Sequence, residues 1–108
     1  MNTLKGIAAS YGIARGRVKV IHNPEDRGKL KAGEILVTTF TSPLLTPALL
    51  KASAIVTDTG GKTCHGAIIA RELGIPCVVG TEKATKVLRD GMEIIVDGEK
   101  GVIYYERK

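Results

Sequence analysis

The sequence has few aromatic residues and almost no cysteine. Of its 108 residues none is tryptophan, one is phenylalanine and three are tyrosine. The core must therefore be built from valine, isoleucine, leucine and alanine. The two cysteines, Cys64 and Cys77, could pair with each other, but in a non-secreted chain with only two we expect both to remain thiols. A chain of this length can bury a core without such cross-links.

Long apolar runs and strongly clustered charge are also missing. No run approaches the roughly 20 residues of a membrane span, and the N-terminal segment lacks the apolar stretch of a secretory signal. The net charge is +5, but the lysines and arginines are scattered and not interleaved with aromatics, as a nucleic-acid surface would require. We therefore expect a cytoplasmic protein with no nucleic-acid or membrane partner.

Glycine and proline divide the chain into short elements. Alternating or continuous apolar residues predict strands at 16–21, 35–37, 54–57, 77–79, 92–96 and 102–105, the last two forming a hairpin. Helices are predicted from Pro47 to Lys51, from Cys64 to Leu73, and from a Thr81 cap to Leu88, with turns at 22–26 and 90–91. Gly74 is placed to end the middle helix in the left-handed conformation. The sequence predicts one α/β domain, residues 1–108, with mixed sheets and few short helices.

The stretch TDTGGKTCHGAIIARELGIPCVVG, residues 57–80, carries the candidate chemistry. GGKT resembles the end of a nucleotide-binding phosphate loop, but that motif needs a glycine five residues before Gly61, where Val56 stands. A zinc site needs three or four ligands. Cys64 and His65 are adjacent and project differently, and the second histidine, His22, lies in a predicted turn. We predict neither a nucleotide loop nor a metal site.

Cys64 is also a poor candidate for a nucleophile. Neighbouring residues at the start of a helix rarely place an imidazole against a thiol as a Cys–His pair requires. A small cysteine in this position more often packs into the core.

The histidine itself can carry the chemistry. His65 begins a helix after Gly60 and Gly61, where unpaired N–H groups and the helix dipole attract anions and disfavour the imidazolium form. A neutral imidazole beside a phosphate cradle is suited to accept a phosphoryl group. Thr63 would add a hydroxyl donor, and Gly61 and Lys62 would add backbone donors. Spacing alone supports this interpretation and a simple helix-capping histidine equally.

The segment GGKTCHGAIIARELGIPCVVG resembles the phosphohistidine signature of the phosphoenolpyruvate-utilising enzymes, GG-x-T-[CS]-H-x-[AS]-I-x-A-R-E-L-x-I-P-x-V-x-G. This family includes phosphoenolpyruvate synthase, pyruvate phosphate dikinase and the sugar-transport Enzyme I, and the resemblance is greatest to the synthase. Similarity extends to the opening GIAASYGIARGRVKVI, to ILVTTFTSP and to the closing DGMEIIVDGEKGVIYY.

The resemblance implies a swivelling β/β/α domain that carries phosphate between separate active sites. His65 would be the phosphorylated residue, and Thr63 falls where the dikinase carries a threonine phosphorylated by a regulatory protein. The remaining site residues implied are the loop residues Gly60, Gly61, Lys62 and Cys64, and the helix residues Arg71 and Glu72. We expect a structural salt link or a docking role from that helix pair.

The resemblance also implies which groups this domain does not hold. Mg²⁺ and ATP or phosphoenolpyruvate would bind to an ATP-grasp domain or to a barrel for phosphoenolpyruvate and pyruvate, in trans or in a longer parent chain. These 108 residues contain neither, so we expect no catalysis by the domain alone. The initial methionine and the closing hairpin favour a stand-alone carrier. The rival is a regulatory or docking module, against which the intact motif argues.

Two positions depart from the family pattern. Gly66 stands where alanine or serine is commoner, which is expected to weaken the helix start by up to about 1 kcal/mol. Leu44 follows Pro43 where many relatives place an acidic residue, in the loop expected to dock with a nucleotide domain.

Overall fold

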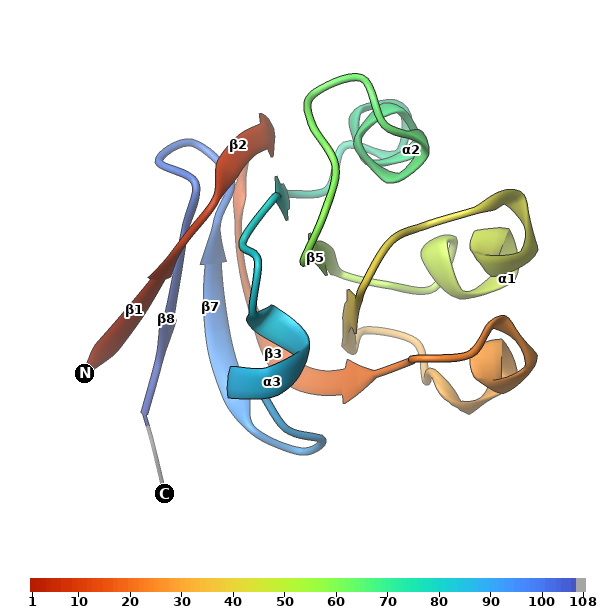
Figure 1. The fold of residues 1–108 in the computed structure, drawn as a ribbon, viewed down its shortest axis with the longest axis horizontal. Helices are drawn as coiled ribbons and strands as arrows, with labels where there is room; N and C mark the ends of the chain where they lie inside the picture. Colours follow the sequence, from red (N-terminus) through yellow and green to blue (C-terminus); the bar gives the residue numbers. More distant parts are fainter. Residues whose placement is uncertain (107–108) are drawn as a thin grey trace.

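The computed structural model describes residues 1–106 (Figure 1). The elements in chain order are β1 (Asn2–Lys5), β2 (Ile7–Ser10), β3 (Ile13–Val20), the 3₁₀ helix η1 (Pro24–Lys29), β4 (Ile35–Thr38), the 3₁₀ helix η2 (Pro43–Leu45), α1 (Thr46–Leu49), β5 (Ala54–Thr57), α2 (His65–Leu73), β6 (Cys77–Val79), α3 (Ala84–Val87), β7 (Glu93–Asp97) and β8 (Val102–Tyr105). Within this range no helix is long and apolar enough to cross a bilayer.

The eight strands pair in the order β1-β8-β7-β3-β4-β5-β6-β2. Strands β3 to β6 run parallel, and the other pairs are antiparallel. The first part of β3 pairs with β7 and its last three residues pair with β4, so this strand passes from one sheet layer into the other. The predicted α/β fold, with a mixed sheet and a few short helices, is confirmed.

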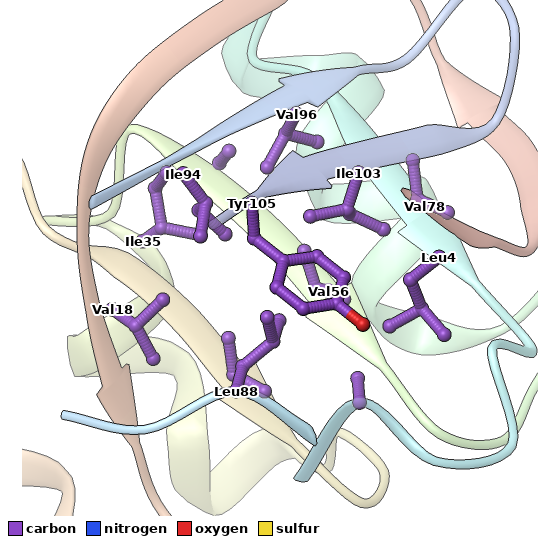
Figure 2. Close-up of a cluster of buried hydrophobic side chains, with 13 residues drawn as sticks. Leu4, Val18, Ile35, Val56, Val78, Leu88, Ile94, Val96, Ile103 and Tyr105 are labelled. Atoms are coloured by element: carbon purple, nitrogen blue, oxygen red, sulfur yellow. The ribbon is translucent and has the colours of Figure 1, made fainter. Parts of the chain in front are cut away.

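Alternate residues of the central strands serve two separate cores. In β4, Ile35 and Val37 face one core while Leu36 faces the other. The inner core lies between the two sheet layers and is built by residues of β1, β3 to β8 and α3, with the ring of Tyr105 near its centre (Figure 2). The outer core lies between β4–β6 and the helices α1 and α2. Because both faces are covered, these strands consist of continuous apolar runs.

Strands β1 and β2 were not predicted from the sequence. Asn2–Lys5 is largely polar, and Ile7–Ser10 consists mainly of small residues, so neither carries a strong strand pattern. β3 also begins earlier than predicted, at Ile13, because it pairs there with Asp97 of β7.

The turn predicted at 22–26 proves to be the start of η1. The side chain of Asn23 accepts a hydrogen bond from the Glu25 N–H at 3.1 Å, and Pro24 occupies the first turn. This capping lets the chain continue helically to Lys29 rather than reverse at once.

Two predicted helix ends are confirmed. Gly74 ends α2 with φ +73°, and its N–H donates to the Ala70 carbonyl. The Thr81 hydroxyl accepts from the Ala84 N–H at 3.2 Å and so caps the start of α3.

Gly6 joins β1 to β2 where the sheet almost closes on itself (Figure 1). Its N–H donates to the Gly101 carbonyl at 2.9 Å. A Cβ atom at Gly6 would lie 2.6 Å from the Val79 carbonyl oxygen and 2.8 Å from Val78 Cγ1. Only glycine therefore lets the chain cross this closely over β6.

We predict that Gly6→Ala lowers the free energy of unfolding by about 1–3 kcal/mol, the usual cost of forcing extra atoms into a packed site. Urea denaturation followed by circular dichroism measures the effect. Gly28→Ala is the matched control, because a Cβ atom at Gly28 would meet nothing within 4 Å. Equal unfolding midpoints for the two variants would contradict the close crossing at Gly6.

Candidate functional site

The glycine-rich loop joins the carboxyl end of β5 to α2. The N–H and the hydroxyl of Thr59 both donate to the Thr39 carbonyl, each at 3.0 Å, and the Thr57 hydroxyl donates to the Thr59 carbonyl at 2.6 Å. These bonds fix the start of the loop to the end of β4. The carboxyl edge of neighbouring parallel strands is the usual place for a site in an α/β sheet.

Asp58 anchors the same loop from the other side. Its side chain is buried and accepts hydrogen bonds from the Thr85 N–H at 2.9 Å and the Thr85 hydroxyl at 2.6 Å. The carboxylate therefore ties the base of the loop to α3. Sequence reasoning did not single out Asp58; the available signal was an acidic residue directly after a buried strand.

Gly60 and Cys64 shape the turn before the helix. Gly60 has φ +106°, a conformation that favours glycine, and a Cβ there would lie 3.1 Å from Cys64 Sγ. The Cys64 N–H donates to the Gly61 carbonyl at 3.1 Å and closes the turn. Cys64 also packs against the outer core, in agreement with its interpretation as a packing residue.

His65 is the first residue of α2. Cys64 precedes it in extended conformation and gives no side-chain cap, and the first intrahelical bond runs from the Ile68 N–H to the Cys64 carbonyl at 3.1 Å. The N–H groups of the first helical turn are thus left without intrahelical acceptors. No acidic residue lies in that turn. The helix start is therefore suited to an anion.

The two ring nitrogens of His65 differ in environment. Nδ1 is buried and has no hydrogen-bond partner among the described residues, while the residue as a whole is partly exposed. Nε2 is therefore the ring nitrogen that an incoming group can reach.

Gly66 has a packing role that helix propensity alone does not reveal. A Cβ atom at Gly66 would lie 2.7 Å from Thr41 Oγ1 and 2.9 Å from Thr41 Cγ2. The loop after β4 thus rests directly on the first turn of α2. The sequence expectation that Gly66 merely weakens the helix start is incomplete, and Thr41 is a neighbour of the site that sequence reasoning missed.

Arg71 and Glu72 form no ion pair within residues 1–106. Adjacent residues on a helix point in different directions, so a link between them is not favoured. Arg71 instead donates from Nη1 to the Ala9 carbonyl at 2.7 Å. In place of the expected salt link, a hydrogen bond joins α2 to β2.

The remaining candidates carry little chemistry. Cys77 is buried, and burial, with a smaller effect from Cys64, raises the pKa of its thiol to about 12, so it stays protonated at neutral pH. Both cysteines are free thiols, as expected. His22 is exposed and lies outside the loop. In the part of the chain that the structure describes, no three metal-ligating side chains come together.

Fold and site together define a β/β/α domain with a histidine at a glycine-framed helix start. The sequence profile of the PEP-utilising enzyme mobile domain matches residues 30–101. The chain belongs to this family, as its resemblance indicated.

Curated relatives point to one branch of the family. The chain is 60% identical over 104 residues to a probable phosphoenolpyruvate synthase of Archaeoglobus fulgidus, covering 96% of this chain and 14% of the relative. It is 57% identical over 101 residues to the phosphoenolpyruvate synthase of Pyrococcus furiosus, covering 94% and 12%. The Escherichia coli phosphoenolpyruvate synthase is 48% identical over 105 residues, with 94% and 13% covered. The chain therefore spans only 12–14% of the length of these relatives.

Solved structures agree with the fold. An Enzyme I solution structure superposes with a TM-score of 0.65 at 30% identity, covering 77% of this chain and 34% of that chain. The holo-form of Thermococcus kodakaraensis aconitase X gives a TM-score of 0.75 at 24% identity, covering 99% and 100%. The second likeness concerns the fold alone.

The contact between Gly66 and Thr41 can be tested by a double-mutant cycle. Gly66→Ala gains about 1 kcal/mol of helix propensity, but we expect a net loss of about 1–2 kcal/mol because the new methyl group displaces Thr41. In the Thr41→Ala background, which removes Oγ1 and Cγ2, the same change should cost at least about 1 kcal/mol less. Urea unfolding of the four proteins gives the coupling energy, and strict additivity would contradict the contact.

Proposed function

We propose that this domain is a phosphoryl carrier, in which His65 accepts a phosphoryl group from one site and passes it to another. The observation that carries the proposal is the placement of a reachable ring nitrogen at a helix start whose first-turn N–H groups lack intrahelical partners. The membership of the PEP-utilising mobile-domain family supports it.

The transfer can be written on the two ring nitrogens. The Nε2 lone pair attacks the phosphorus, a nitrogen–phosphorus bond forms, and the bond from phosphorus to the donor's leaving oxygen breaks with its electron pair. A neutral ring that reacts through the Nε2 lone pair carries its proton on Nδ1, and this proton stays on Nδ1 during the transfer. The positive charge that develops on the ring is offset by the attached phosphoryl group, and transfer to the acceptor reverses these steps.

The loop before His65 supplies the remaining groups of the proposed site. Thr63 and Lys62 are both exposed, and no hydrogen bond to another described residue holds either side chain. We assign the Thr63 hydroxyl and the N–H groups of Gly61 and Lys62 as donors to the phosphoryl oxygens. Gly60 and Cys64 hold the turn in shape through their close contact.

The donor and acceptor sites belong to other domains in this proposal. Phosphoryl transfer needs neutralisation of the charge on the moving group, usually by metal ions and Arg or Lys, and residues 1–106 form no metal-binding cluster. We place Mg²⁺ and ATP or phosphoenolpyruvate on an ATP-grasp domain or a barrel domain, in trans or in a longer chain. The length of the phosphoenolpyruvate synthase relatives supports this division.

Apolar side chains near the site are suited to docking with such a partner. Phe40 and Leu44 are each 62% exposed on the segment after β4, and Ile68 is 42% exposed one turn after His65. Leu44 adds an exposed apolar side chain at a position where the family resemblance implies an acidic residue. The +5 net charge would favour encounter with a partner surface of opposite charge.

We predict that a competent partner, Mg²⁺ and labelled donor phosphorylate His65 at Nε2, giving an acid-labile, base-stable product. The 3-phosphohistidine form, identified by ³¹P–¹H NMR, follows from the burial of Nδ1. Without a partner, neither ATP nor phosphoenolpyruvate should label the domain.

The controls use the second histidine. His22→Ala should label normally, because His22 is exposed and outside the loop, and His65→Ala should not label. Label retained in His65→Ala would overturn the proposal, and an unlabelled but partner-binding wild-type domain would support the docking-module alternative. Rapid labelling of the isolated domain would show that it holds a complete active site.

We predict that Thr63→Val slows transfer by about 10- to 1,000-fold, as the loss of a hydrogen-bond donor to a transition-state oxyanion does. Thr63→Glu should be slower still, because its carboxylate repels the incoming phosphoryl group. Both variants should unfold at the wild-type urea concentration, since the Thr63 side chain is exposed. Unchanged single-turnover rates in both would show that the hydroxyl takes no part.

A further inference from the structure

A pocket opens between β2, the C-terminal part of α2 and the β7–β8 turn, and Lys62 of the glycine-rich loop also lines it. Its volume is about 640 Å³, within the roughly 300–1,000 Å³ typical of small-molecule sites. We call it the β2 pocket. Its polar lining residues are Ser10, Tyr11, Lys62, Arg71 and Glu99. The transfer chemistry proposed for His65 uses only the backbone N–H of Lys62, and neither the Lys62 side chain nor the other lining residues.

Ser10 supplies an unpaired hydroxyl to this pocket. The residue as a whole is only 7% exposed, and its side chain forms no hydrogen bond within residues 1–106. Its oxygen is not among the buried side-chain atoms that lack a partner, and Ser10 lines the pocket. The hydroxyl is therefore open to the pocket and free to bond with an oxygen atom of a bound molecule.

Arg71 supplies a positioned cation. Its Nη1 is held by the Ala9 carbonyl at 2.7 Å, which fixes the guanidinium group against the wall of the pocket. Its other N–H groups have no partner among the described residues. A planar guanidinium with free donors matches the geometry of a carboxylate or a phosphate group. Lys62, also unpaired within residues 1–106, adds a second positive charge.

Glu99 limits the charge that the pocket accepts. It is the one carboxylate among the lining residues, against the two cations. A molecule with a single anionic group can approach Arg71 and Lys62, whereas a second anionic group would be repelled by Glu99.

We propose that the β2 pocket binds a small molecule carrying one carboxylate or phosphate group, which Ser10, Arg71 and Lys62 hold, while Glu99 selects against polyanions. The glycines and alanines that complete the lining give room for a compact apolar body, and Tyr11 lies at the exposed rim. The site does not depend on whether His65 accepts a phosphoryl group.

Titration of the ¹⁵N-labelled protein with two probes tests the proposal and distinguishes the two chemistries. Butyrate represents the carboxylate and glycerol 3-phosphate the phosphate. At least one probe should shift the amide signals of Ser10, Gly74 and Gly98 to saturation, with a millimolar dissociation constant. Ser10→Ala and Arg71→Gln should each weaken binding by about fivefold or more, as expected for the loss of one hydrogen bond.

The chain offers matched controls. Arg27 is also exposed and donates from Nη1 to a backbone carbonyl, that of Pro24 at 3.0 Å, so Arg27→Gln should leave binding unchanged. Glu99→Gln should strengthen binding by about two- to fivefold and should admit citrate, because it removes the repelling charge. Because Glu99 is exposed, Glu99→Gln should not disturb the fold. It therefore still tests the proposal if a substitution at Ser10 or Arg71 disturbs β2.

The outcomes separate this site from the helix start. Binding to the β2 pocket should persist in His65→Ala. If no probe gives saturable shifts up to about 50 mM, or if Arg27→Gln weakens binding as much as Arg71→Gln, the proposal is wrong. Shifts confined to Gly61 and Gly66 would place the anion at the helix start and would equally overturn it.

Discussion

The rest of the structure depends on the burial of β4, β5 and β6 on both faces. Their side chains alternate between the inner and outer cores, so each strand holds a sheet layer on one side and helices on the other. A one-residue slip would exchange the two sets of side chains. Because the register is fixed in this way, the carboxyl ends of β4 and β5 hold their loops in a defined position. The loop after β5 leads into α2, so the position of the start of α2 is fixed as well.

The elements that rest on local patterns could be predicted from the sequence. The apolar runs of β4 to β6 and the left-handed stop at Gly74 follow from neighbouring residues alone. β1 could not be predicted, because its stability comes from pairing residues 2–5 with residues 102–105 across nearly the whole chain. The candidate site divides in the same way. The motif around His65 is contiguous, whereas the contact of Thr41 with Gly66 and the position of Ser10 depend on tertiary packing.

The helix start explains why a carrier of this kind would need partners. A helix dipole contributes only about 0.3–1 kcal/mol to an exposed charge, far less than the 8 kcal/mol or more by which enzymes usually lower a barrier. It can orient a phosphoryl group on His65 but cannot drive its transfer. In the proposed division of roles, this domain contributes position, and the donor and acceptor domains contribute the cations.

The crossing at Gly6 has a consequence for how such a domain can associate. β1 and β2 occupy the two ends of the strand order, are four residues long each, and are continuous through Gly6. Long unpaired strand edges are templates for joining another chain into the sheet, and short ones are not. A domain built in this way presents side chains rather than long free backbone edges to its surroundings, and contacts between side chains can form and release without disturbing the sheet.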